Sequence, residues 1–156
     1  MELCSPDFNG NDSIPERHTC DGSDQSPGLR WGGLPKGARS LVLVVDDPDA
    51  PDPAAPQRTW VHWLLYDIPP NSSGLPAGGL PLPAGTMEGL NDWNRTGYGG
   101  PCPPIGRHRY FFRLFALDTT LSPLAHPTRA DVEEAMRGHV LAHAELMGTY
   151  RRRGNS

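Results

Sequence analysis

Two polar residues, His108 and Tyr110, lie at the start of an apolar segment. The segment 100–106 holds three prolines and two glycines, and it runs directly into the apolar segment 108–117. Proline fixes the φ angle and glycine permits angles that other residues avoid, so this turn should be stiff. Because side chains alternate along a strand, His108 and Tyr110 should point to the same face. An imidazole and a phenol placed together in this way could form one wall of a ligand pocket.

Further polar residues accompany two other apolar segments. Asp47 and Asp49 follow the run 40–46, and His62 lies within the run 59–67. Since strands this apolar bury both faces, each polar side chain there needs a partner, and we expect Asp47 to accept a hydrogen bond from a histidine. Imidazoles and a phenol around one small space, with turn amides, suit an oxyanion such as phosphate, sulfate or a carboxylate. The alternative is that each residue satisfies only its local backbone, because spacing alone does not show that they converge.

Three apolar segments, 40–46, 59–67 and 108–117, predict the strands that must position these side chains. Their length and β-branched content favour buried strands over helices. The middle segment is apolar on both alternating faces, so it should lie centrally in a sheet. Strict alternation would place His62 on the same face as Trp60 and Leu64.

Two other parts of the chain differ from these strands. Residues 69–92 are rich in proline, glycine and serine, and a loop of this length in a compact domain is usually functional. From Thr128, a candidate N-cap, to about Tyr150 the apolar period predicts a C-terminal helix. His139 and His143 are four residues apart there, a spacing that could hold a metal. No third ligand is evident, so we predict ordinary helix histidines and no metal site.

The composition favours a single β-rich domain over residues 1–156. The 18 glycines and 18 prolines are too many for a helix bundle and indicate short strands joined by many turns. The formal net charge of −4 gives no support to nucleic-acid binding, which usually needs a basic surface. No apolar stretch approaches about eighteen residues, so we predict no membrane span.

The three cysteines are Cys4, Cys20 and Cys102. Their number is odd, their spacing is wide, and no Cys-x-x-Cys pair is present, so neither a zinc site nor a disulfide framework is predicted. The N-terminus lacks a basic and then apolar leader. We therefore expect a cytoplasmic protein with reduced thiols, and nothing in the sequence calls for a cofactor.

Two short motifs resemble the signature regions of the phosphatidylethanolamine-binding protein family, also called Raf kinase inhibitor proteins. They are the segments 47–51 and 100–104, the second of which is followed by His108. The strand that carries His62 has the family's expected position between them. The resemblance covers nearly the whole chain, and segments near both ends resemble the bacterial and archaeal branch.

The resemblance implies a mainly β fold that is sandwich-like, with a large central antiparallel sheet, a smaller sheet and peripheral helices. It also implies a small anion-binding pocket at one end of the sheet. The candidate ligand-binding residues are Asp47, Asp49, Pro51, Trp60, His62, Cys102, Pro103, His108 and Tyr110. The chain departs from the eukaryotic pattern, which often has a second histidine at the position of Val61. Bacterial relatives resemble homodimers, so a homodimer is a possible assembly.

Three functions fit these residues. The leading hypothesis is a binding protein for a phosphate-like or carboxylate-like group, held by His62, His108 and Tyr110 with Asp47 orienting a histidine. The first alternative is an acid–base enzyme that uses the two histidines and Asp47 on a small polar substrate. Cys102 could be its nucleophile or could serve only the shape of the turn. The second alternative is a protein-interaction module that inhibits a kinase or protease through the long proline-rich loop.

Overall fold

The computed structural model describes residues 1–154 as eight strands with two short helical segments. The strands are β1 Glu2–Cys4, β2 Leu29–Gly32, β3 Ser40–Ala50, β4 Arg58–Ile68, β5 Gly74–Leu75, β6 Met87–Glu88, β7 His108–Leu117 and β8 Val140–Tyr150. The α-helix α1 covers Arg129–Met136, and a single 3-10 turn, η1, covers Glu16–His18.

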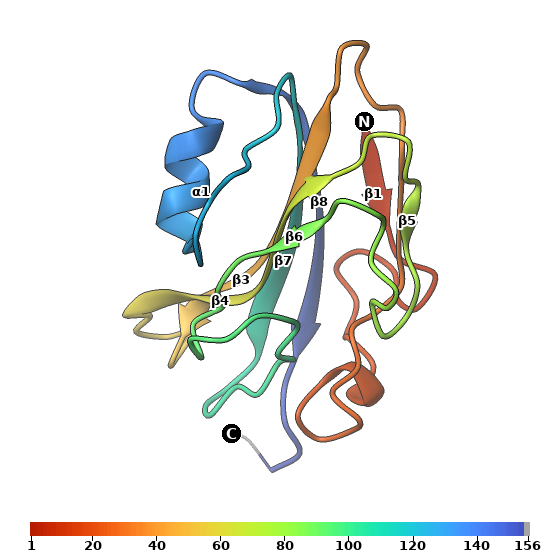
Figure 1. The fold of residues 1–156 in the computed structure, drawn as a ribbon. Helices are drawn as coiled ribbons and strands as arrows, with labels where there is room; N and C mark the ends of the chain where they lie inside the picture. Colours follow the sequence, from red (N-terminus) through yellow and green to blue (C-terminus); the bar gives the residue numbers. More distant parts are fainter. Residues whose placement is uncertain (155–156) are drawn as a thin grey trace.

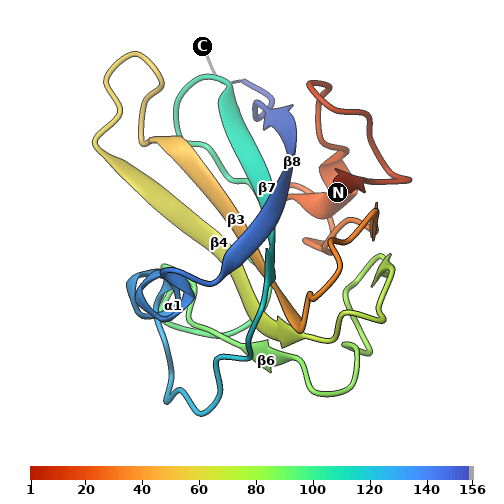
Figure 2. The same cartoon turned by 90° about the horizontal axis from the view of Figure 1, so that it is seen from above.

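The strands form two antiparallel sheets. The large sheet has the order β6-β4-β3-β7-β8 and the small sheet the order β1-β2-β5. The small sheet lies on one side of the large sheet and α1 lies on the other (Figure 1), and the view from above shows the same arrangement (Figure 2). The expected mainly β, sandwich-like fold with a large and a small antiparallel sheet is therefore confirmed.

Each face of the large sheet buries its own apolar cluster. Leu43 and Val45 of β3 belong to the core between the two sheets, whereas Val42 and Val44 belong to the cluster that includes Val132 of α1. Because successive strand residues point to opposite faces, a strand covered on both sides must be apolar at nearly every position. This is the physical reason for the uninterrupted apolar run in β3.

The helix predicted from residue 128 to about residue 150 is wrong beyond Met136. Thr128 does cap α1: its hydroxyl accepts from the amide of Asp131, whose carboxylate accepts from the amide of Thr128. The chain then turns at Gly138, whose φ is 82°, and β8 pairs with β7 along its length. The competing strand signal is the alternation of small or apolar residues with polar ones between residues 142 and 146.

The two histidines of this segment consequently do not share a helix face. His139 Nδ1 lies 2.7 Å from the Asp118 carboxylate, and the His143 ring lies 6.2 Å from that of Phe115. Within residues 1–154, no cluster of three or more His, Cys, Asp or Glu side chains is arranged to hold a metal ion. That same part of the chain contains no helix with the length and apolar character needed to cross a membrane.

The expectation of three reduced thiols is also wrong. Cys20 and Cys102 form a disulfide across 82 residues of sequence, and Cys4 is free and exposed. The fold places the segment after η1 beside the proline-rich turn, where the amide of Cys20 donates to the carbonyl of Pro101 at 3.1 Å. Wide spacing concealed this pair because only tertiary structure brings the two segments together.

Candidate functional site

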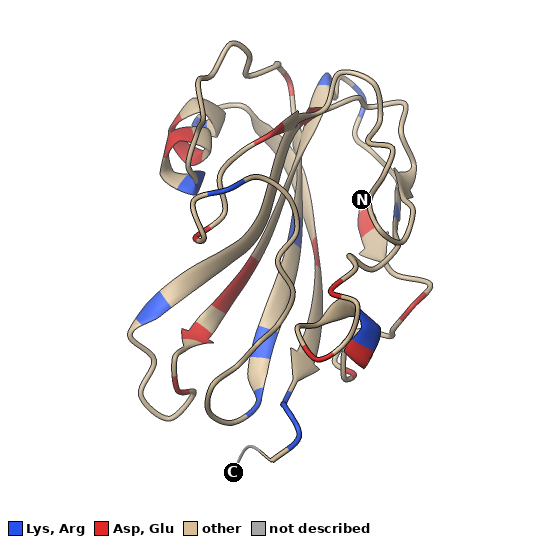
Figure 3. Ribbon diagram, turned by 60° about the horizontal axis from the view of Figure 1, so that its bottom comes forward, with Lys and Arg blue, Asp and Glu red and all other residues tan. Residues whose placement is uncertain are grey.

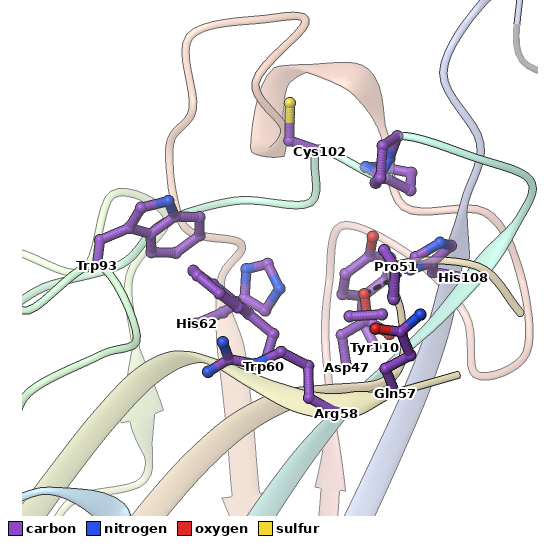
Figure 4. A pocket seen from close by; sticks show the side chains of 13 residues that line it. Asp47, Pro51, Gln57, Arg58, Trp60, His62, Trp93, Cys102, His108 and Tyr110 are labelled. Atoms are coloured by element: carbon purple, nitrogen blue, oxygen red, sulfur yellow. Dashed lines mark hydrogen bonds and ion pairs between the residues drawn. The ribbon is translucent and has the colours of Figure 1, made fainter. Parts of the chain in front are cut away.

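A cavity of about 480 Å³ lies where the C-terminal end of β3 meets the N-terminal ends of β4 and β7. Four polar side chains predicted from the sequence line it together: Asp47, His62, His108 and Tyr110 (Figure 4). Four other predicted residues complete much of its apolar wall, namely Pro51, Trp60, Cys102 and Pro103. The structure thus brings together residues that sequence spacing could not show to converge.

A β-bulge directs His62 into this cavity. Val45 pairs with Trp63 and the next residue, Asp46, pairs with Val61, so His62 is the extra residue on β4. Bulges locally change which way a strand presents its side chains and are common beside functional sites. Trp60 lines the same cavity as His62, as predicted, whereas the predicted shared face with Leu64 is wrong, because Leu64 packs in the cluster under α1, on the side away from the cavity.

His62 has a defined tautomer. Its Nδ1 lies 2.7 Å from the carbonyl oxygen of Gly99, which can only accept, so Nδ1 carries the proton. Burial lowers the pKa of the His62 imidazole, with the Gly99 hydrogen bond acting in the opposite sense. At neutral pH the ring is therefore uncharged and Nε2 holds a lone pair. A second proton can be added at Nε2 when an anion compensates for its charge.

His108 differs from His62 because both of its nitrogens face acceptors. Nδ1 lies 2.6 Å from the carboxylate of Asp47, and Nε2 lies 2.8 Å from the carbonyl oxygen of Ile105. The expected hydrogen bond from a histidine to Asp47 is thus confirmed. Since both ring nitrogens already face protein acceptors, His108 leaves no free nitrogen for a ligand.

Two buried donors on the cavity wall form no hydrogen bond of good geometry within residues 1–154, although one of them lies close to the Asp47 carboxylate. They are the hydroxyl of Tyr110 and the indole N–H of Trp60. Burial, reinforced by the charge of Asp47, raises the pKa of the Tyr110 phenol, so the hydroxyl keeps its proton at neutral pH. Buried donors that no protein group satisfies are costly, and they are suited to an acceptor that enters the cavity.

Asp49 does not line this cavity. Its carboxylate accepts from the backbone amide, Nε and Nη2 of Arg109 at 2.9, 3.0 and 2.8 Å. These hydrogen bonds, ahead of the opposing effect of burial, lower the pKa of Asp49. The predicted ligand-binding role is therefore not supported by its position, and the side chain instead ties β3 to β7.

Sequence reasoning missed three residues at the cavity mouth. Gln57 and Arg58 precede β4 or begin it, and Trp93 comes from the loop before the proline-rich turn. The Arg58 guanidinium lies 4.4 Å from the centre of the Trp60 ring, and Trp93 packs edge-on against both Trp60 and His62 at 5.4 and 5.2 Å. The alternation of residues 58, 60 and 62 on one strand was an available signal for Arg58.

Charges alternate between neighbouring strands at this end of the sheet. Acidic bands on β3 lie between basic bands on β4 and β7 (Figure 3). Asp46, fully buried on the opposite face from the cavity, pairs with Arg113 at 3.1 Å and with Arg129 at 2.8 Å. On β4, Arg58 lines the cavity and lies 3.7 Å from the Asp92 carboxylate.

Comparison with known proteins assigns the chain and its fold to one family. The family model described as phosphatidylethanolamine-binding protein matches residues 4–151. The chain belongs to the phosphatidylethanolamine-binding protein family. The sequence is 51% identical to a UPF0098 protein of Methanothermobacter thermautotrophicus, with 97% of this chain and 99% of that protein aligned.

Solved structures of the family resemble the whole chain. A homologue of phosphatidylethanolamine-binding protein from Chlamydia trachomatis superposes with a TM-score of 0.89 at 40% identity, covering 97% of both chains. YbcL of Escherichia coli, described as a member of the mammalian family, superposes with a TM-score of 0.87 at 32% identity, covering 97% of this chain and 98% of its own. The resemblance seen in two sequence motifs therefore extends to the complete fold.

The contacts in the cavity bear on the enzyme alternative. Cys102 is bonded to Cys20 and so offers no thiol, and both nitrogens of His108 already have acceptors. Acid–base chemistry would consequently depend on Nε2 of His62.

Proposed function

We propose that this protein binds a small oxyanion, free or as the head group of a larger molecule, in the cavity between β3, β4 and β7. One observation carries the proposal: two buried donors, the Tyr110 hydroxyl and the Trp60 indole N–H, line the cavity without partners. An anionic oxygen accepts from several donors at once and would satisfy both.

The charges around the cavity support the same ligand class. The Arg58 guanidinium lines the cavity, where it lies 3.7 Å from the Asp92 carboxylate and can also contact an anion. His62 Nε2 can take up a proton as the anion enters, so that a third donor forms only in the complex. The name of the family refers to a lipid whose head group contains a phosphodiester, which belongs to this class.

The pH dependence of sulfate binding tests the proposal. Sulfate keeps its charge between about pH 5.5 and pH 8, so a change in affinity must come from the protein. A bound anion favours the protonated His62 ring, whose pKa in the free protein is lowered by burial. Affinity should therefore rise as pH falls, by an amount on the order of tenfold over this range. Isothermal titration calorimetry measures it directly.

The variant His62→Gln should remove most of this pH dependence while keeping a side chain that can contact Gly99. His143→Gln is the matched control, because His143 is exposed on β8, away from the cavity, and its removal should leave the dependence unchanged. Equal sulfate affinity at the two pH values, or a pH dependence that survives in His62→Gln, would overturn the proposal. Circular dichroism verifies that each variant is folded.

A further inference from the structure

The Cys20–Cys102 disulfide stands at the mouth of the cavity. Cys102 lines the cavity, and its sulfur points away from the other labelled side chains (Figure 4). Both cysteines are exposed to solvent. Thiol–disulfide exchange requires that an incoming thiolate reach one of the sulfur atoms, and exposure of both residues meets this requirement. A buried structural disulfide would not offer such access.

The disulfide restrains the part of the wall that follows the hydrogen-bonded segment. Before Cys102, the amide of Gly100 donates to Asp24 at 2.8 Å and the carbonyl of Pro101 accepts from Cys20 at 3.1 Å. Pro103 and Pro104, which follow, form the cavity wall itself. Opening the disulfide removes the covalent tie at the start of this wall.

The same segment positions His62. The carbonyl of Gly99 binds Nδ1 of His62 at 2.7 Å, and the amide of Gly99 donates to the backbone carbonyl of His62 at 3.0 Å. Gly99 lies only three residues before Cys102. When the disulfide is reduced, this segment should be more mobile in the ligand-free protein. Binding a ligand must then order the segment, and the entropic cost of this ordering weakens binding.

We propose that the Cys20–Cys102 disulfide is a thiol-exchange site that controls ligand affinity, with the oxidised form binding tightly and the reduced form weakly. The inference rests on the proposed anion-binding function. A dithiol reductant attacks one sulfur to form a mixed disulfide, and the other cysteine leaves as a thiolate that takes up a proton. The second thiol of the reductant then displaces the remaining cysteine. The protein gains two thiols, and the reductant is oxidised to a cyclic disulfide.

The test uses the full chain with Cys4→Ser, so that the one free cysteine cannot exchange with the pair. Sulfate affinity is measured by calorimetry in the oxidised protein and after anaerobic treatment with dithiothreitol, and alkylation followed by mass spectrometry counts the thiols. Reduction should weaken sulfate binding by about fivefold or more and should speed amide hydrogen exchange in residues 97–106. Reoxidation should restore both properties.

The variant Cys20→Ser in the same background provides a permanently open form and keeps Cys102. It should bind sulfate as weakly as the reduced protein and should not respond to dithiothreitol.

Unchanged affinity and unchanged amide exchange after complete reduction would overturn the exchange site while leaving anion binding intact. Absence of sulfate binding in the oxidised protein would instead overturn the proposed function, and faster exchange of residues 97–106 on reduction would still support the restraint by the disulfide. Failure of dithiothreitol to open the bond in the folded protein would also overturn the exchange site.

Discussion

At the scale of single residues, the polar groups of the cavity wall are of two kinds. Some are hydrogen-bonded within the protein, and others remain available to a ligand. Asp47 and His108 satisfy one another, and His62 is held by Gly99. The hydroxyl of Tyr110 has no such partner. Replacing a side chain that lacks a protein partner should change ligand affinity more than the free energy of unfolding. Mutagenesis can measure the two effects separately.

The substitution Tyr110→Phe should weaken sulfate binding by roughly 3- to 10-fold, since one net hydrogen bond contributes about 0.5–1.5 kcal/mol. It should change the free energy of unfolding by less than about 0.5 kcal/mol, because no hydrogen bond of the free protein is lost. Tyr150→Phe is the matched control: its hydroxyl donates to Asp21 at 2.6 Å, so stability should fall without a change in affinity. Urea denaturation and calorimetry report the two quantities, and a reversed pattern would refute this assignment.

At the scale of secondary-structure elements, the cavity depends on how β3 is joined to its neighbours. The register with β4 shifts twice near the site, once at His62 and once between Asp47 and Ala50. On the other side, Asp49 joins β3 to β7 through Arg109. These irregular positions direct the polar side chains, while the regular parts of the strands supply the core.

The substitution Asp49→Asn should show how much the contact between Asp49 and Arg109 stabilises the fold, because the loss of unfolding free energy that it causes should depend on pH. Because the pKa of Asp49 is lowered in the folded protein, the carboxylate stabilises the fold above its unfolded pKa, about 3.9, and this stabilisation is lost as pH falls through the lower folded value. The variant should lose roughly 1–3 kcal/mol of unfolding free energy at pH 7, and the difference from the native protein should shrink in acid below about pH 4.

Urea titrations at several pH values measure this difference. Glu134→Gln is the control, because Glu134 pairs with Arg137 on the exposed surface of α1 and its loss should cost less than about 0.5 kcal/mol. A constant difference between Asp49→Asn and the native protein at all pH values would show that the carboxylate charge is not the cause.

At the scale of the whole molecule, the N-terminal segment closes the edge of the large sheet. Asn11 and Ile14 donate to carbonyls of β8 at 2.7 Å, and the amide of Thr149 donates to Asp12 at 3.0 Å. Side chains of this segment pack against β8 at Gly148, where a Cβ atom would lie 2.6 Å from Ile14 and 2.8 Å from Phe8. The glycine therefore permits close approach of the two segments.

Gly148→Ala should destabilise the fold by about 1–3 kcal/mol, because both neighbouring side chains are buried and must shift. Gly10→Ala is the matched control, since its Cβ atom would meet only the Leu146 side chain at an ordinary 3.6 Å. Thermal and urea unfolding compare the two variants. Equal stability of Gly148→Ala and Gly10→Ala would contradict this account of the packing between the N-terminal segment and β8.

The three main strands, the two signature motifs and four polar residues of the cavity could be predicted from the sequence, whereas Gln57 and Arg58 were missed. The prediction was possible because buried strands are marked by their composition and because polar residues within them are rare enough to attract attention. The hydrogen bond from a histidine to Asp47 followed from the same reasoning, although the choice of His108 over His62 did not.

Tertiary structure alone decided the remaining features. The strand β8 exists because β7 offers a pairing edge, whereas its sequence also carries a helical period. A bulge at His62 puts Leu64 on the other face of the sheet, and Asp49 turns to Arg109 instead of the cavity, so strict alternation misplaced both side chains. The disulfide joins segments 82 residues apart. Each of these outcomes depends on a partner that is distant in the chain, and local sequence carries no signal of where such a partner will lie.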